Sequence, residues 1–360
     1  MADAIVKCLI WDLDNTLWRG TVLEDTEVTL GAGIKEVVAE LDSRGILQSV
    51  ASRNDHDLAW AWLEKLGIAE YFVLPEINWG PKSESVRRIA DSLQFAHSAV
   101  AFIDDQPAER AEVAHHLPEV RCYDAASATS LPSLPEFSPA VVTDDARRRR
   151  LMYKSGFERE AARESFTGLD EEFVASLGLE MSIAHATERE LARVEELTLR
   201  TSQMNATGVH YSQETLRELM SDPRHDVLVI AMEDRFGPHG AVGILLLERH
   251  PRVWHLKLLA TSCRVVAFGA GSVILRWIID QAAANGAHLA ADFLPTKRNR
   301  MMEVAYRFSG LTGEHCPCLA DVTAGAGREE IQVLHMTPQR MDAPATMRLV
   351  APDLGSGNGH

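Results

Sequence analysis

The 360-residue chain lacks the features expected of membrane proteins and general nucleic-acid-binding proteins. It contains no stretch of about 18 uncharged apolar residues, which a membrane-spanning helix would need. Its 36 Lys and Arg residues are outnumbered by 52 Asp and Glu residues, and the formal net charge of −16 disfavours general nucleic-acid binding. The first residues run straight into an apolar segment, without the order of regions typical of a signal peptide. We therefore expect a cytoplasmic protein.

Cysteine is also scarce. The five cysteines lack the spacing of a disulfide framework, which is typical of a reducing compartment. The His-Cys-Pro-Cys segment at 315–318 resembles half of a metal knuckle. No second Cys or His pair with zinc spacing accompanies it, so the sequence alone does not favour a structural zinc site.

The chain has enough length for two or three domains, and 46% of its residues are hydrophobic. In the first part, apolar runs alternate with helix-like segments. The runs are 5–11, 46–51, 71–75, 99–103 and 120–123, and the helix-like segments lie near 33–44, 55–66, 82–93 and 107–117. This pattern predicts an α/β domain whose parallel sheet is covered on both faces. Such sheets bind ligands at the carboxyl ends of their strands.

The second part has a different order, with three consecutive strand-like runs joined by short turns. Strands are expected at 179–185, 226–232, 240–248, 252–260, 287–294 and 330–336, and helices at 187–203, 212–221, 271–285 and 297–308. Consecutive strands predict a separate α+β domain with a largely antiparallel sheet. The expected domains are 1–140 and 177–340. A Pro/Ser-rich stretch at 130–139 and a bridging helix within 141–176 link them, and a flexible tail follows at 341–360.

Carboxylates follow two of the predicted parallel strands. Asp12 and Asp14 come where the first strand ends, and Asp104 and Asp105 follow the fourth. Neighbouring carboxylates are costly without a cation, and Mg²⁺ with oxygen ligands would neutralise them. One carboxylate could then attack phosphorus while another protonates the leaving oxygen.

Groups suited to phosphate follow the other strands. Ser52 ends the second apolar run, Asn54 follows it, and Lys82 stands at a predicted helix start, where free N–H groups favour an anion. An isolated Asp pair is often only a helix cap, and an isolated Lys is usually just solvated. Four matching groups at four strand ends instead predict a phosphoryl-transfer site.

The segment DLDNT at 12–16, together with Ser52, Lys82 and the Asp pair at 104–105, resembles the four motifs of the haloacid dehalogenase (HAD) superfamily. The resemblance implies that Asp12 is the nucleophile and Asp14 the general acid and base. It implies phosphate binding by Thr16, Ser52, Asn54 and Lys82, and Mg²⁺ binding by Asp12, Asp14, Asp104 and Asp105. Which of Asp104 and Asp105 binds the metal directly stays open. The short gaps between the motifs leave no room for a large cap domain.

From residue 5 to about 310, the chain is similar to the FkbH-like group of HAD proteins. Segments that carry the similarity include KCLIWDLDNTLWRG, GPKSESV, FIDDQPAERAEV, LTLRTSQMNATG and FLPTKRNRMM. The similarity implies a bifunctional glyceryl transferase and phosphatase. Such an enzyme would take 1,3-bisphosphoglycerate, remove phosphate and load a glyceryl unit as a thioester onto an acyl carrier protein (ACP) for polyketide biosynthesis.

The second domain resembles GCN5-type acyltransferases, which implies a pantetheine arm held beside a splayed central strand. The Gly-rich turn would span 264–271, but Val266 stands where the usual pattern has Arg or Gln, which disfavours acetyl-CoA binding. ACP carries the same arm without the adenosine-side pyrophosphate. The implied acyl and pantetheine contacts are Gln203, Asn205, Thr207, Arg264, Gly269 and Gly271.

Cys263 is the leading candidate for a transient glyceryl thioester. A buried structural cysteine is the alternative, and direct attack by the ACP thiol would make an enzyme cysteine unnecessary. Basic residues suited to docking an acidic ACP are Arg147, Arg148, Lys297, Arg298 and Arg300. Solvated helix faces are the alternative reading of these five residues.

Two other functions fit the same sequence. One is a fusion of a magnesium-dependent small-molecule phosphatase with a CoA-dependent acyltransferase, and Val266 weighs against it. The other is a non-catalytic ACP-binding scaffold, which has no need of the intact set of Asp12, Asp14, Lys82 and Asp104.

Overall fold

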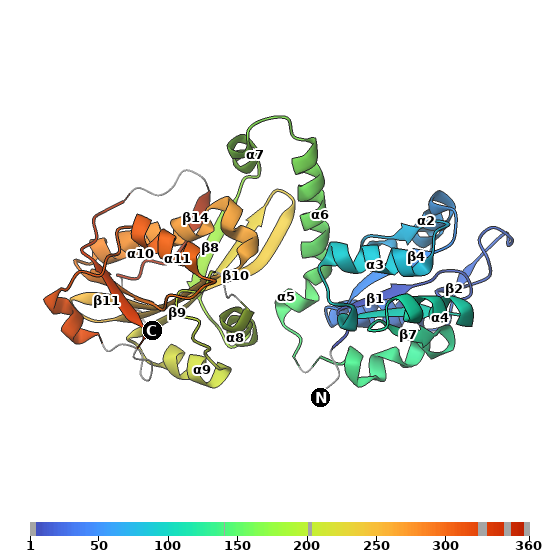
Figure 1. Cartoon of the computed structure of the whole chain (residues 1–360), viewed down its shortest axis with the longest axis horizontal. Helices are drawn as coiled ribbons and strands as arrows, with labels where there is room; N and C mark the ends of the chain where they lie inside the picture. Colours follow the sequence, from blue (N-terminus) through green and yellow to red (C-terminus); the bar gives the residue numbers. More distant parts are fainter. Residues whose placement is uncertain (1–4, 140, 201–203, 323–329, 342–346, 356–360) are drawn as a thin grey trace. The chain divides into compact units, whose positions relative to one another are not determined.

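The computed structural model describes residues 5–139, 141–200, 204–322, 330–341 and 347–355 (Figure 1). The side chains of Leu199, Arg200 and Cys263 lie outside this description. The chain divides into two compact units, Met1–Lys154 and Ser155–His360. The division falls inside helix α6 (Arg149–Ser165), within the range expected to contain the bridging helix. Among the described helices, none is both long and apolar enough to cross a membrane.

The first unit is built on a five-stranded parallel sheet in the order β5-β4-β1-β6-β7. Its strands are β1 (Cys8–Trp11), β4 (Leu47–Ser52), β5 (Glu76–Ile77), β6 (Val100–Asp104) and β7 (Arg121–Asp124). Every residue of β1, β4 and β6 is buried, as expected for strands covered on both faces. The predicted parallel sheet is confirmed. The strand predicted at 71–75 is wrong, because a 3₁₀-helix, η1 (Ala69–Tyr71), precedes a strand that begins only at Glu76.

Helices cover both faces of this sheet. They are α1 (Ile34–Ser43), α2 (His56–Lys65), α3 (Lys82–Leu93) and α4 (Pro107–His116). Leu9 and Trp11 of β1 share a core cluster with Val38 of α1 and Leu63 of α2, while the alternate residues of β1 are buried toward the other face. A small hairpin, β2 (Trp18–Arg19) and β3 (Thr29–Leu30), lies between β1 and α1. The described segments between β1 and α3 hold no large cap, as predicted.

The Pro/Ser-rich stretch at 130–139 is not a linker. It forms two 3₁₀-helices, η3 (Ala125–Ser133) and η4 (Pro135–Phe137). Leu131 and Phe137 are fully buried in the same cluster as Leu9, because apolar residues spaced by three lie on one side of a 3₁₀-helix. This segment therefore completes the core of the first unit.

The Arg-rich segment that follows starts with α5 (Asp144–Arg147) and continues into α6. Arg149 donates to Gly45 O at 2.6 Å, and Arg150 donates to Asp42 Oδ1 at 3.0 Å. These two arginines therefore anchor the start of α6 to the first unit. Arg147 and Arg148, which the sequence predicts as ACP-docking residues, are exposed.

The second unit holds a seven-stranded sheet in the order β13-β12-β11-β10-β9-β8-β14. Its strands are β8 (Glu180–His185), β9 (His225–Asp234), β10 (Gly237–Arg249), β11 (Val253–Thr261), β12 (His288–Phe293), β13 (Gln332–Met336) and β14 (Arg348–Val350). Strands β8 to β11 pair antiparallel, as predicted, and β11 pairs parallel with β12.

Helices cover both faces of this sheet too. They are α7 (Asp170–Ser176), α8 (Leu191–Arg200), α9 (Gln213–Ser221), α10 (Ala270–Ala284) and α11 (Arg300–Phe308). In β9, Val227 and Val229 pack in one core cluster with α8 and α9, and Leu228 and Ile230 pack in the other with α10 and α11. The period-two alternation of a strand thus feeds two separate cores.

The predicted flexible tail is wrong for residues 347–355. Strand β14 pairs parallel with β8. Beyond it, Leu354 is buried, its N–H donates to Gln281 Oε1 at 2.9 Å, and its carbonyl accepts from Arg249 at 2.7 Å. Three residues are too short a run for an alternating pattern to stand out in the sequence.

Strands β11 and β12 diverge after a short pairing. The pairing ends at Leu256 and Ala291, and residues 204–207 lie between the strands beyond that point. Ala206 N–H donates to Leu259 O at 3.1 Å, and Leu294 N–H donates to Ala206 O at 2.9 Å. The gap between the diverging strands is therefore closed by the chain's own backbone.

Candidate active site

An acidic cluster with a buried lysine lies at the carboxyl edge of the parallel sheet. Asp12 follows the central strand β1, and Asp104 ends its neighbour β6, so both carboxylates emerge at the same edge. Lys82, the first residue of α3, places its Nζ 2.5 Å from Asp12 Oδ1 and 3.0 Å from Asp104 Oδ2. The lysine side chain is only 2% exposed. The structure thus brings together three of the residues that the sequence predicts at this site.

Glu109 is a fourth member that the sequence analysis missed. It lies in the first turn of α4, with Oε2 2.9 Å from Lys82 Nζ and Oε1 3.2 Å from Arg53 Nη1. An acidic residue in a first turn is usually explained by the helix dipole. The signal that could have revealed it is its place in the helix that directly follows the Asp104 strand, at the same edge of the sheet.

Three carboxylates surround one ammonium in this cluster. Burial raises the pKa of Asp12, although Lys82 opposes the rise. Burial and the nearby Asp12 raise the pKa of Asp104 to about 7. Burial acts to lower the pKa of Lys82, but the carboxylates outweigh it and the pKa is raised, so the ammonium stays charged. The excess of acidic groups over basic ones is what a divalent cation would neutralise.

The donors present fit magnesium. Carboxylate oxygens of Asp12, Asp104 and Glu109 all lie within 4.8 Å of one another, and Mg²⁺ prefers such hard oxygen ligands. Nearby, Asp105 Oδ1 is buried with no hydrogen-bond partner in the described part of the chain. Of the four predicted metal ligands, Asp12 and Asp104 lie in the cluster, whereas the carboxylates of Asp14 and Asp105 lie outside it.

Asp14 is held by the hairpin and by Asn54. Its Oδ1 accepts from Trp18 Nε1 at 2.8 Å and from Val22 N–H at 3.2 Å. Its Oδ2 accepts from Asn54 Nδ2 at 3.0 Å. The predicted role of the Asp14 side chain as a metal ligand is corrected, because its oxygens are bound by these three donors.

The predicted phosphate-binding residues fall into two pairs. Ser52 and Lys82 both hydrogen-bond to Asp12. Asn54 instead positions Asp14, and Thr16 Oγ1 accepts from the Asp105 N–H at 3.0 Å. Only the first pair therefore adjoins the Asp12 carboxylate directly.

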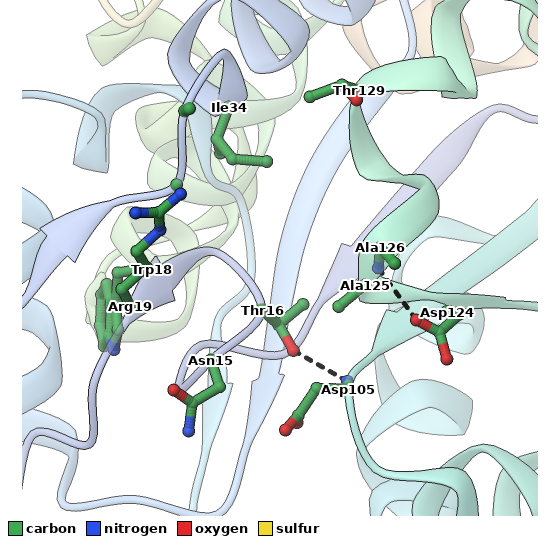
Figure 2. A pocket seen from close by; sticks show the side chains of 12 residues that line it. Asn15, Thr16, Trp18, Arg19, Ile34, Asp105, Asp124, Ala125, Ala126 and Thr129 are labelled. Atoms are coloured by element: carbon green, nitrogen blue, oxygen red, sulfur yellow. Dashed lines mark hydrogen bonds between the residues drawn. The ribbon is translucent and has the colours of Figure 1, made fainter.

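A cavity of about 480 Å³ opens beside these residues (Figure 2). It lies between the β2–β3 hairpin and the turn after β7. Its lining residues are Asn15, Thr16, Trp18, Arg19, Gly31, Ala32, Ile34, Asp105, Asp124, Ala125, Ala126 and Thr129. Figure 2 shows the bond between Thr16 and Asp105 in this lining. Because Asp105 is adjacent to Asp104 in the chain, the cavity has room for the part of a substrate beyond its phosphate.

In the second unit, Gln203 and the Cys263 side chain fall outside the described part. Asn205 and Thr207 are buried. Asn205 Oδ1 accepts from the N–H groups of Thr207 and Gly208 at 3.1 and 2.7 Å, so it closes its own turn. Thr207 Oγ1 likewise accepts from the next turn of chain, at Val209 N–H. These side chains hold the segment between β11 and β12, and their placement does not support the predicted direct contact with a pantetheine arm.

The predicted Gly-rich turn at 264–271 forms the 3₁₀-helix η5 (Cys263–Phe268) and the start of α10. Gly269 has φ 72° at the N-cap of α10, a left-handed conformation that favours glycine, and Gly271 lies in the first turn. Arg264 is exposed, and its Nε donates to Ser262 Oγ at 3.3 Å. The predicted docking residues at the start of α11 are also exposed: Lys297, Arg298 and Arg300.

Residues 19–116 match the family model of haloacid dehalogenase-like hydrolases. The match includes Ser52, Lys82, Asp104 and Glu109 and begins after Asp12. No curated protein matches the chain.

Solved structures similar to parts of the chain fall into two groups. The phosphatase-domain-containing N-terminal part of a Bacteroides fragilis protein, complexed with Mg, is 30% identical over 38% of this chain and 42% of that one, with a TM-score of 0.34. Tetrahymena GCN5 is 14% identical over 46% of this chain and 99% of its own, with a TM-score of 0.34. The Escherichia coli ribosomal-protein-S18-alanine N-acetyltransferase is 14% identical over 46% of this chain and 97% of its own, with a TM-score of 0.32.

The chain spans less than half of the Bacteroides fragilis protein. The family match, the parallel sheet and the acidic cluster at its carboxyl edge agree with one another. The first unit of this chain therefore carries a haloacid dehalogenase-like hydrolase domain.

Proposed function

We propose that the first unit hydrolyses a phosphate monoester, with Asp12 as the nucleophile. The observation that carries this proposal is the Asp12 carboxylate, hydrogen-bonded to Lys82 and Ser52 at the edge of the sheet. An attacking carboxylate has to be oriented, and these two donors do this in the resting site. The same donors suit the phosphoryl oxygens that would arrive beside Asp12.

In the proposed reaction, an Asp12 oxygen forms a bond to phosphorus while the bond from phosphorus to the leaving oxygen breaks. Asp14 gives that oxygen a proton. Asp14 then takes a proton from water, the water oxygen attacks the aspartyl phosphate, and phosphate leaves with Asp12 restored. Lys82 holds positive charge beside the reacting group throughout.

Magnesium fits this site through Asp12 and Asp104, with Glu109 and Asp105 as the nearest further carboxylates. When bound, Mg²⁺ would offset the negative charge of the phosphate and of the acidic cluster. Lys82 and Ser52 would remain the protein's own donors to the phosphoryl group.

For the whole chain, we propose the glyceryl-loading function implied by the similarity over residues 5–310. The ACP thiol would attack the acyl carbonyl of 1,3-bisphosphoglycerate, forming the C–S bond and expelling one phosphate. The remaining phosphate monoester would be hydrolysed at Asp12, and the two steps balance in either order. The cavity beside Asp105 supports an extended substrate, because it leaves space next to the acidic cluster.

The second unit is proposed to receive the ACP and its pantetheine arm. An arm lying along the free edge of β11 would have to replace the Ala206 bond to Leu259, so binding requires residues 204–207 to move. Cys263 remains the proposed site of a transient thioester. The exposed positions of Arg148 and Arg298 are consistent with docking an acidic partner.

The test is intact mass spectrometry of ACP incubated with the protein, Mg²⁺ and 1,3-bisphosphoglycerate. We expect a glyceryl adduct without phosphate from the wild type, and a phosphoglyceryl adduct from Asp12→Asn. Asp91→Asn, which changes an exposed aspartate of α3, is the matched control and should behave as the wild type. The absence of any adduct would reject glyceryl transfer, and acetyl-CoA turnover without ACP would favour the fused phosphatase and acyltransferase instead.

A further inference from the structure

Two thiols and two imidazoles converge in the second unit, apart from the residues used above. His288 begins β12 and His335 lies in β13. Cys316 precedes the 3₁₀-helix η6 (Pro317–Asp321), and Cys318 lies within it. One ligand atom from each of the four residues lies within 4.8 Å of the other three.

The separations within this group are short and nearly equal. Cys316 Sγ lies 3.2 Å from Cys318 Sγ, and the two sulfurs lie 3.4 and 3.3 Å from His288 Nδ1. His335 Nε2 lies 3.3 Å from Cys318 Sγ and 3.0 Å from His288 Nδ1. Bonds of about 2.3 Å to sulfur and about 2.0 Å to nitrogen place the ligands of a tetrahedral zinc roughly 3.3–3.8 Å apart. The cluster is slightly tighter than that and has the form of a small tetrahedron.

The register of the sheet builds the histidine pair. Ala290 of β12 lies opposite His335 of β13, and His288 precedes Ala290 by two residues on the same face. The two imidazoles are therefore diagonal neighbours on one face of an antiparallel pair. This juxtaposition is a property of the fold, because the histidines are far apart in the sequence.

The cysteines are delivered by the segment that runs beside β13. Thr312 and His335 exchange backbone hydrogen bonds of 2.9 and 2.7 Å. Pro317 then starts η6, which sets Cys316 and Cys318 on either side of it. Cys318 packs against Val253 and Ala290, so the segment is seated on the sheet.

Hydrogen bonding alone accounts poorly for this arrangement. Both cysteines are free thiols, and each thiol has a single hydrogen to donate. Cys318 Sγ nevertheless faces three heteroatoms, from Cys316, His288 and His335. A cation accepts a lone pair from all four groups at once, and sulfur with imidazole nitrogen selects zinc over magnesium.

We propose that His288, Cys316, Cys318 and His335 bind one Zn²⁺ ion. All four tetrahedral positions are supplied by the protein, which makes the site structural, without an open position for a substrate. Zinc would tie the segment 312–322 to strands β12 and β13. The proposal is independent of the phosphatase reaction, because none of these residues belongs to the first unit.

The competing state is a disulfide between Cys316 and Cys318. A disulfide needs its sulfurs about 2.05 Å apart, whereas these lie 3.2 Å apart. The disulfide would remove two hydrogens from the mass of the chain and would leave the histidines without a metal partner. Mass and metal content therefore separate the two states.

The experiment measures zinc by mass spectrometry of metals in the full chain, purified without a polyhistidine tag. We expect one zinc per chain in the wild type, and loss of that zinc in the double variant Cys316→Ser, Cys318→Ser. Cys122→Ser, at a half-buried cysteine of β7, is the matched control and should keep its zinc. Asp12→Asn should also keep it, which separates this site from the acidic cluster.

A second measurement does not depend on the folding of a variant. Wild-type protein stripped of metal under reducing conditions and reloaded with Co²⁺ should show the strong visible absorption of a tetrahedral cobalt–thiolate centre. Zinc no higher in the wild type than in the double variant, or no such cobalt spectrum, would overturn the proposal. A Cys316–Cys318 disulfide in freshly isolated protein would overturn it as well.

Discussion

Lys82 Nζ lies 2.5 Å from Asp12 Oδ1, so the proposed nucleophile and the cation that would hold its phosphate are already paired in the resting site. The pair is buried, and Lys82 also contacts Asp104 and Glu109. One ammonium therefore serves both the electrostatics of the folded unit and the chemistry of phosphoryl transfer.

Lys82→Met should remove this shared cation. We expect a loss in kcat of about 10²–10³ on a phosphate monoester, the usual effect of removing one stabilising group at a developing charge. Steady-state kinetics with p-nitrophenyl phosphate and Mg²⁺ would measure it. Lys35→Met, at an exposed lysine of α1, is the control and should keep its activity. Equal kinetics for the two variants would contradict the proposed role of Lys82.

Asp14→Asn should slow reactions according to their leaving group. An alkyl oxygen needs a proton as it departs, whereas p-nitrophenolate leaves without one. Loss of the acid should cost about 10²–10⁴ with an alkyl phosphate and clearly less in the single-turnover release of p-nitrophenol. Rapid-quench measurements of both substrates would show the difference. Equal losses for the two leaving groups would exclude Asp14 as the proton donor.

The Arg159–Asp234 pair should control the acid stability of the second unit. Arg159 Nε of α6 lies 2.5 Å from Asp234 Oδ2. Burial acts to raise the pKa of Asp234, but hydrogen bonds from His239 and Arg159 outweigh it and hold the pKa well below its usual range. A lowered pKa means that the carboxylate stabilises the fold above about pH 4 and loses this contribution as the pH falls further.

Asp234→Asn should therefore lower the melting temperature at neutral pH and flatten its fall toward acid. Removing one partner of a buried pair costs about 3–5 kcal/mol. Thermal unfolding between about pH 7 and about pH 3 would compare the variant with the wild type, relative to the usual carboxyl range. Asp353→Asn is the control, since Asp353 is an exposed residue beyond β14. Parallel stability curves for Asp234→Asn and the wild type would refute the assignment.

Asn299 should determine how firmly the gap beside β11 is closed. Its buried Nδ2 donates to Asn205 O at 3.1 Å and to Leu294 O at 2.9 Å. Asn299→Ala leaves these buried carbonyls short of a donor, at a cost of about 1–3 kcal/mol. Hydrogen exchange should show faster exchange of the Ala206 amide, whereas Asn285→Ala, at an exposed helix end, should leave it unchanged.

The sequence predicted the acidic cluster because strand order alone brings strand ends together. Asp12 and Asp104 follow neighbouring strands of a parallel sheet, so their meeting follows from the topology. Glu109 escaped prediction because nothing in its helix turn distinguishes it from a dipole-stabilising residue. The side-chain direction of Asp14 escaped too, since Trp18 and Asn54 set it through contacts that no spacing encodes.

The zinc proposal shows the limit of motif spacing more clearly. Cys316 and Cys318 are adjacent in the sequence, but the register of two strands supplies His288 and His335. A search for a second knuckle cannot find ligands that lie on separate strands. The tail was missed for a similar reason, because β14 depends on pairing with a strand far earlier in the chain.

The bond from Trp18 to Asp14 couples access to proton delivery. Trp18 belongs to the small hairpin that borders the cavity, and Val22 of the same hairpin supplies a second donor to Asp14. A hairpin swung outward by an entering substrate would take both donors with it and leave the carboxylate tethered by Asn54 alone. Admission of the substrate and unlocking of the acid would then be one motion, which would keep the proton donor restrained while the cavity stands empty.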